Sequence, residues 1–176
     1  VTGLITNSGA SGSGGGIQVD AAGVLTAAGI TNNAGATVFN HGMINSAVNN
    51  AGTVNNFIDG TASSLTNTGG TFVNQGNIAG SATISGGTFS GTGTAGSVQV
   101  NMGGTFAPGS GTPGSSMSVS GSLAFQSGAI YAVQIDPSTA SFTSVGGTAT
   151  LGNATVNATF ASGSYVAKQY TIVTAG

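Results

Sequence analysis

The 176 residues include no cysteine, one histidine (His41) and only four charged side chains, which are Lys168, Asp20, Asp59 and Asp136. So little positive charge excludes an electrostatic surface for nucleic acid or an anionic membrane, because the phosphates would not be neutralised. Without cysteine there is no disulfide framework and no thiolate chemistry. Hydrophobic residues make up 39% of the chain, more than disordered linkers usually contain, so we expect a folded domain.

Residues 1–29 combine short apolar pairs with a Gly/Ser tract, GASGSGGG, at 9–16. No Lys follows the tract and no GxGxxG spacing is present, so we expect a loop between coils and not a phosphate-binding loop. The chain begins at Val1, without Met or a signal-like segment, and we expect it to be a piece of a longer protein. No stretch reaches the ~18 apolar residues of a membrane-spanning helix.

From residue 30 to about 125 the sequence repeats itself. GGTF occurs at 69–72, 86–89 and 103–106, so each copy begins seventeen positions after the last. The longer phrase ITNNAGATVFNHGMI (30–44) returns as LTNTGGTFVNQGNI (65–78). Short apolar groups separated by Gly, Asn and Ser are typical of short strands. A fixed short period is typical of a solenoid, and the repeat therefore predicts an all-β fold, a single-stranded parallel β-helix with about 17 residues per coil.

If residues one coil apart lie above one another, the repeat predicts a principal inward ladder of apolar side chains. Its members are Val38, Val54, Phe72, Phe89, Phe106 and Leu123. A slip of one residue would put Phe39 in place of Val38. The residue before each member would face outward, which predicts an exposed rank of Thr37, Thr53, Thr71, Thr88 and Thr105.

Asparagine recurs near the expected corners of the coils, at Asn32, Asn40, Asn50, Asn67 and Asn74. Asn tolerates left-handed backbone angles and can bond its own copy one coil away. We expect these amides, together with the hydroxyls, to solvate a stack that has few charges.

After residue 125 the pattern changes to longer strands that no longer follow this period. Tyr131, Val133 and Ile135 alternate with more polar residues before Asp136-Pro137, which is typical of a half-buried strand. Further strands are expected around 148–160 and 165–174. We predict a C-terminal cap of hairpin-like strands that closes the stack, and divide the chain into stem repeats at 1–125 and a cap at 126–176.

Five phrases near the C-terminus resemble, in order, the C-terminal part of autotransporter passenger domains, the type V secreted proteins of Gram-negative bacteria. They are GGTFAPGS (103–110), GSLAF (121–125), SGAIYAVQI (127–135), GGTATLGNATV (146–156) and SGSYVAKQYTIVTAG (162–176). The stem repeats are similar to the β-helical stem of such passengers. TASFTSV (139–145) departs from the pattern, since many relatives have a polar Ser-Asp there.

The resemblance implies a right-handed parallel β-helix that is exported across the outer membrane and is either secreted or displayed at the cell surface. It implies an autochaperone region beginning near residue 103, which folds early and serves as a template for later coils. The implied partner is the protein's own C-terminal outer-membrane β-barrel, which this chain does not include.

Catalysis would have to use His41, the only imidazole, with a serine and one aspartate. His41 aligns with Gln75 in the matching phrase, so a solvent-facing turn position is the simpler interpretation. Asp59 and Asp136 lie far apart in the sequence in turn-forming pairs, whereas glycoside cleavage needs two acids ~5–9.5 Å apart. One His and three scattered Asp residues do not make a metal site. We therefore predict no enzymatic activity, no cofactor, no metal and no small-molecule substrate.

Other solenoid functions fit less well. Hexapeptide acyltransferases keep a strict sixfold spacing that is absent here, and calcium-binding nonapeptide repeats need an Asp in every repeat. The Thr rank could suggest ice binding, but Thr is also simply a good residue for an exposed strand. We predict a structural stem that promotes folding and secretion. The alternative is an adhesin-like module that uses the uncharged Thr/Asn flank to bind a host surface or to self-associate.

Overall fold

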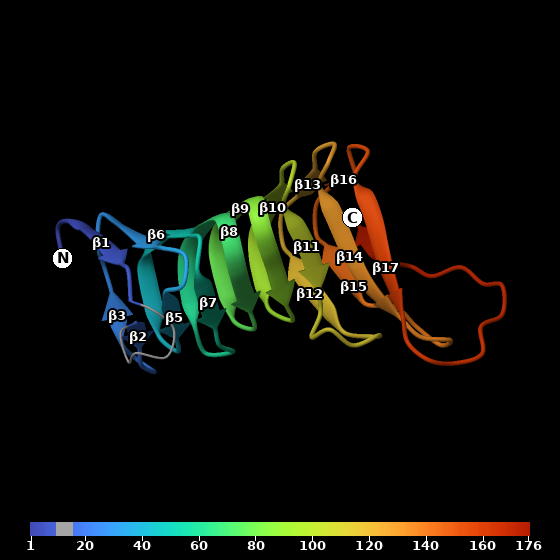
Figure 1. Ribbon diagram of the computed structural model, residues 1–176, viewed down its shortest axis with the longest axis horizontal. Helices are drawn as coiled ribbons and strands as arrows, with labels where there is room; N and C mark the ends of the chain where they lie inside the picture. Colours follow the sequence, from blue (N-terminus) through green and yellow to red (C-terminus); the bar gives the residue numbers. More distant parts are fainter. Residues whose placement is uncertain (10–15) are drawn as a thin grey trace.

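The computed structural model describes residues 1–9 and 16–176 and is built of strands (Figure 1). It is a parallel β-helix, the fold class that the repeat predicts, with coils stacked from the N-terminal to the C-terminal end. The described residues contain no helix, and so none that is long and apolar enough to cross a membrane. The Gly/Ser tract, expected to be a loop, lies outside the described residues except at its two ends.

The strands line three faces of the coil, and each pairs in parallel with its counterpart one coil away. Face A is formed by β1 (Leu4–Asn7), β4 (Gly29–Asn32), β13 (Leu123–Phe125) and β16 (Ala149–Thr150). Face B is formed by β2 (Ile17–Val19), β5 (Thr37–Asn40), β7 (Thr53–Asn56), β11 (Thr105–Pro108), β14 (Ile130–Ile135) and β17 (Thr155–Phe160). Face C is formed by β3 (Val24–Leu25), β12 (Ser116–Val119), β15 (Phe142–Val145) and β18 (Val173–Ala175).

Four longer strands bend around the corners and contribute to more than one face. They are β6 (Met43–Asn50), β8 (Thr61–Asn74), β9 (Asn77–Gly91) and β10 (Thr94–Val100). Their pairings contain register shifts where the chain turns, for example between Ile44 and Ala47. β8 and β9 each cover all three faces of the coil.

The core is a filled interior lined by inward columns of side chains. The face B column occupies eight levels, with Ile17, Val38, Val54, Phe72, Phe89, Phe106, Tyr131 and Val156 in register. The rings of Phe72 and Phe89 lie 5.8 Å apart between centroids, and those of Phe89 and Phe106 lie 5.7 Å apart. Val38 is fully buried while Phe39 is 41% exposed, which decides the register between them.

The predicted place of Leu123 in this column was wrong, although Leu123 is buried. Leu123 pairs with Val98 and Ala149 on face A, and Tyr131 takes the place above Phe106 on face B. The reason is the long connection between β11 and β12, which has seven residues, 109–115. In the preceding coil the same corner is turned by two residues, 92 and 93. From Phe106 onward the coils are longer than those between Val38 and Phe106, because the column steps from Phe106 to Tyr131 and then to Val156.

Contrary to expectation, the corner asparagines do not solvate the surface but lie inside the coil. Asn7, Asn32, Asn50 and Asn67 form one buried ladder, and Asn40, Asn56 and Asn74 form a second. Each side chain bonds its copy one coil away, and none has a positive φ, since the only described non-glycine residues with positive φ are Ala22 and Asn153. No buried side-chain polar atom among the described residues lacks a partner.

The strands of residues 126–176 are two to six residues long, so they are shorter than β6, β8, β9 and β10 and are not the longer strands expected there; they continue the parallel stack. Of the strand expected around 165–174 only β18 (Val173–Ala175) forms. β14 pairs in parallel with β17, and β15 pairs in parallel with β18. Hairpin-like pairing is limited to an antiparallel bridge between Ile135 and Ala140 around the Asp136 turn. The predicted cap does not cover the last coil, where Val156 and Phe160 are exposed.

The Tyr131 hydroxyl ties the C-terminal coils together. It donates to the Ile172 carbonyl and lies 2.9 Å from the Thr143 hydroxyl. Both partners belong to the chain that follows β14, so one buried phenol links β14 to the two coil segments that pack beside it.

Candidate functional site

The outer surface of face B carries the Thr rank. Thr37, Thr53, Thr71, Thr88 and Thr105 occupy one register column. Each is half-buried and not fully exposed as expected, because neighbouring strands cover part of it. The column ends there, since Ile130 pairs with Thr105 in the next coil.

A second outward column lies two residues further along each strand. It contains Phe39, Asn55, Val73, Ser90 and Ala107. In the next coil Ala132 directly follows Tyr131, which is in register with Phe106. Neither this column nor the Thr rank contains a charged side chain, so the outer surface of face B is uncharged.

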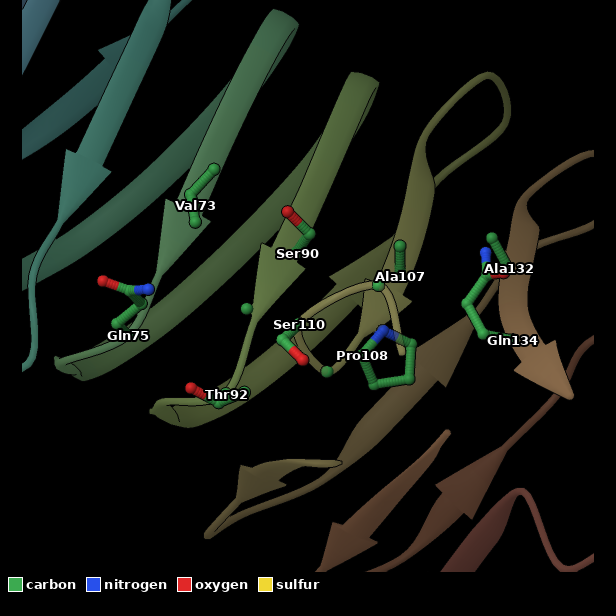
Figure 2. A pocket seen from close by; sticks show the side chains of 12 residues that line it. Val73, Gln75, Ser90, Thr92, Ala107, Pro108, Ser110, Ala132 and Gln134 are labelled. Atoms are coloured by element: carbon green, nitrogen blue, oxygen red, sulfur yellow. The ribbon is translucent and has the colours of Figure 1, made fainter. Parts of the chain in front are cut away.

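A groove of about 310 Å³ lies over the C-terminal half of this face (Figure 2). Val73, Ser90, Ala107 and Ala132 stand side by side on successive strands and form one side of it. Amides and hydroxyls are added by Gln75, Thr92 and Ser110 at the neighbouring corner and by Gln134 near the end of β14. The groove is lined by no titratable group, so it can offer hydrogen bonds and small apolar contacts but no acid–base chemistry.

The corner that follows face B carries most of the titratable residues of the stem. The residues directly after the in-register Val19, Asn40 and Asn56 are Asp20, His41 and Phe57, so these three follow one another along the axis of the helix. Backbone bonds hold this alignment, since the His41 amide donates to the Val19 carbonyl and the Phe57 amide donates to the Asn40 carbonyl.

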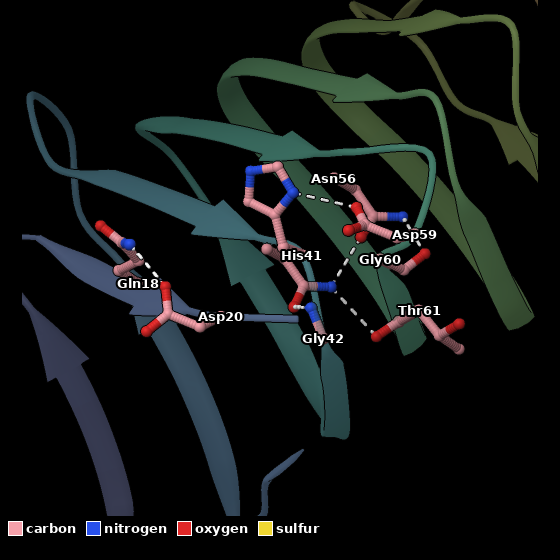
Figure 3. A network of polar contacts seen from close by, with 9 residues as sticks. Gln18, Asp20, His41, Gly42, Asn56, Asp59, Gly60 and Thr61 are labelled. Atoms are coloured by element: carbon pink, nitrogen blue, oxygen red, sulfur yellow. Dashed lines mark hydrogen bonds and ion pairs between the residues drawn. The ribbon is translucent and has the colours of Figure 1, made fainter. Parts of the chain in front are cut away.

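At this corner His41 lies between an aromatic ring and a carboxylate (Figure 3). Its Nδ1 is 2.9 Å from Oδ1 of Asp59, and both side chains are well exposed, at 39% and 46%. The ring stacks on Phe57 with centroids 3.9 Å apart and an interplanar angle of 7°. Phe57 in turn stacks on Phe39 at 6.4 Å. Exposed polar side-chain pairs of this kind stabilise a fold by no more than ~1 kcal/mol.

A second polar pair lies on the adjoining coil. The Gln18 amide donates to Oδ1 of Asp20 at 2.6 Å, and Figure 3 shows this pair beside His41. A hollow of about 260 Å³ lies between the successive corner turns and is lined by His41 and Asp59, with Val24 and Met43 at its side. Both Val24 and Met43 are exposed, so the hollow has one apolar wall.

His41 and Asp59 line this hollow together with Thr61. His41 contacts an aspartate, but the hollow beside it is lined by no serine or cysteine. Asp59 and Asp136 follow coil levels that are four steps apart, roughly 19 Å at about 4.8 Å per step, which is too far for a glycosidase pair. Among the described residues no three His, Cys, Asp or Glu side chains are grouped so that they could hold a metal ion.

The sequence interpretation placed His41 at a solvent-facing turn, and it lies there, but the aromatic stack around it was missed. A signal was present, because the step from Phe39 to Phe57 equals the step from His41 to Asp59, and both are close to the repeat period. Such a separation puts two residues on neighbouring coils.

The comparisons with known proteins identify no relative. No protein-family model matches this chain, and neither a curated protein nor a solved structure matches it.

Proposed function

We propose that this chain is a structural stem segment of a secreted or surface-displayed protein of the autotransporter type. The observation that carries the proposal is the continuous stack, in which the face B column runs through eight levels from Ile17 to Val156. Seven steps of about 4.8 Å make a rod of roughly 34 Å. In such a rod every coil is held by its neighbours, so it can keep one end away from the other.

We further propose that the coils after residue 103 promote folding of the rest, as the resemblance of their five phrases to autotransporter passengers implies. The largest aromatic cluster of the core supports this. Phe125 lies 6.1 Å from Phe106 and 5.5 Å from Tyr131, and Tyr131 stacks on Phe106 at 5.9 Å. Such pairs add ~0.5–1.5 kcal/mol each beyond their burial, which favours early structure at this end.

Refolding kinetics test the order of folding with two matched variants. Val133 and Val54 are both 1% exposed and both point into the core, one in the C-terminal coils and one in the stem. If the C-terminal coils form the folding nucleus, Val133→Ala slows refolding, whereas Val54→Ala mainly speeds unfolding. If Val54→Ala slows refolding and Val133→Ala mainly speeds unfolding, the C-terminal coils are not the folding nucleus.

Surface display tests the role in secretion, with the chain joined to an outer-membrane barrel. Deleting residues 103–176 is expected to abolish display of folded protein. The control deletes residues 72–88, which form a single coil. This deletion removes one residue from each inward column, among them Phe72, Ile78 and Ala82. The residues that remain in each column stay in register. Equal display of both deletions would count against the proposal.

The uncharged outer surface of face B supports a second proposal, a module for adhesion or self-association. The straight Thr column and the groove beside it offer hydroxyls and amides without charge. The corner asparagines cannot take part, because they lie inside. Replacing Thr71 and Thr88 by Val tests this proposal, which requires that adhesion falls while display stays unchanged.

A further inference from the structure

The exposed aromatic rings at the corner after face B have no structural task that accounts for them. Phe39 points away from the core, and Ile58 at the neighbouring turn is almost fully exposed. Both Phe39 and His41 have faces stacked on Phe57, so the three rings form one row. We call Phe39, His41 and Phe57 the aromatic corner. Contiguous exposed apolar groups with a polar rim mark interaction sites in soluble proteins.

Hydrogen-bonding groups surround the aromatic corner on both sides. Asp59 lies against His41, and the Gln18–Asp20 pair lies on the coil before it (Figure 3). On the following coil Gln75 occupies the position equivalent to Phe57. Asn74 is in register with Asn56, and Gln75 and Phe57 are the residues directly after them. Carboxylate oxygens accept hydrogen bonds, and amide groups both donate and accept. This is a mixture of flat apolar surface and planar polar groups.

The charges select the partner. The two carboxylates at this corner, Asp20 and Asp59, disfavour an anionic ligand, and the single Lys of the chain lies elsewhere in the fold. Lys168 is bound to the carbonyl oxygens of Pro137 and Ser138 in the C-terminal coils. A phosphate, a sulfated polymer or a nucleic acid would therefore find no counter-charge here.

We propose that the aromatic corner binds a neutral, extended oligosaccharide that lies along the axis of the helix. The C–H faces of pyranose rings would pack on Phe39 and Phe57. Ring hydroxyls would donate to the carboxylates of Asp20 and Asp59. The rings of Phe39 and Phe57 belong to neighbouring coils and their centroids lie 6.4 Å apart, so successive rings of one extended glycan can contact both. A longer ligand would continue past Gln75 toward the groove of Figure 2, which Gln75 also lines.

The test presents the whole chain to an array of neutral and anionic oligosaccharides and then titrates the best neutral binder by calorimetry. The proposal requires retention on neutral glycans and a loss of affinity of at least about tenfold in the double variant F39A/F57A. Asp59→Asn should weaken binding several-fold. The matched control is Phe160→Ala, which removes another exposed ring from the far end of the molecule.

Thermal unfolding of each variant verifies that the fold persists. If loss of the half-buried Phe57 destabilises the chain, the single variant Phe39→Ala replaces the double variant in the binding test. No retention on any neutral glycan, retention only on anionic ones, or binding that F39A/F57A leaves unchanged would overturn the proposal. Sedimentation of the same variants separates a protein partner from a glycan. Self-association that F39A/F57A abolishes, without glycan binding, would assign the corner to a second copy of the chain and overturn the proposal.

Discussion

Asn50 and Asn67, one repeat period apart in the chain, share a buried hydrogen bond of 2.7 Å inside the coil. The same Asn50 accepts a hydrogen bond from the Asn32 amide at 2.8 Å on the other side. In this part of the stem, coils are therefore joined by side-chain amides as well as by backbone pairing. A polar ladder in the interior specifies which coil lies on which, because a shift of one residue would leave buried amides without partners.

Removing one rung of this ladder should destabilise the fold. Asn50→Ala takes one amide partner from each of Asn32 and Asn67, and a buried unsatisfied group costs about 1–3 kcal/mol. We expect a loss of about 2–4 kcal/mol in the free energy of unfolding, measured by denaturant titration. The adjacent Asn49 is exposed, so Asn49→Ala should change that free energy by less than about 0.5 kcal/mol. Equal effects of the two variants would show that the ladder is not stabilising.

The aromatic core predicts a second contrast. Phe89 is fully buried between Phe72 and Phe106, and Phe89→Ala should lower the free energy of unfolding by about 3–5 kcal/mol. Phe39 projects outward, and Phe39→Ala should change that free energy far less. Chemical denaturation of both variants checks the orientation of β5 directly, since the reversed order of effects would mean that the register is wrong by one residue.

The Tyr131 hydroxyl makes the C-terminal coils sensitive to high pH. Burial raises the pKa of Tyr131 from 10.0 to about 12, although its hydrogen bond with Thr143 opposes the rise. The stabilisation that depends on the neutral phenol is complete below pH 10, where Tyr131 is protonated in both states. This stabilisation is lost between pH 10 and about 12, because Tyr131 ionises at a lower pH in the unfolded chain than in the folded one. The total loss in the free energy of unfolding is about 2–3 kcal/mol.

Denaturation curves recorded between pH 8 and 12 measure this loss. In Tyr131→Phe the fall in stability over that interval should be smaller, although the variant is less stable at neutral pH because it lacks the bonds to Thr143 and Ile172. Val133→Ala is the control, because Val133 is buried in the same strand and carries no titratable group, so this variant should lose stability without a change in the shape of the pH profile. A profile in Tyr131→Phe that matches the unsubstituted chain would refute the assignment.

The second glycine of the GGTF motif at 86–89 is required by both its backbone and its surroundings. Gly87 has a φ of 64°, and a Cβ there would collide with the carbonyl oxygen of Gly70 on the coil below. Gly35 also has a positive φ, 80°, but a Cβ there would meet no atom within 4 Å. Gly35→Ala should therefore lower the free energy of unfolding only by the cost of a left-handed backbone, about 1–2 kcal/mol. Gly87→Ala should lower it by clearly more, because the collision adds to that cost. Thermal or chemical unfolding of the two variants measures the difference.

The alternation of buried and exposed residues within each strand was predictable because it is local. Val38, Val54, Phe72, Phe89 and Phe106 follow one another at close to one repeat period, and short turns allow little error in register between them. The Thr column follows from the same alternation. The position of Leu123 could not be predicted by counting, since the connection at 109–115 lengthens the coil and only the pairing of β10 with β13 restores the register.

The sequence by itself determined the coil: its period, its short strands, its inward apolar positions and its shortage of charge all follow from residue types at fixed spacing. The tertiary structure alone decided which polar groups are buried and which rings meet on the surface. An asparagine is stable inside only when the next coil supplies another amide, as Asn67 does for Asn50. A row such as Phe39, Phe57 and His41 exists only once the coils are stacked. The buried amide pairs and the row of rings both need two stacked coils, so neither can be read from the sequence of one repeat.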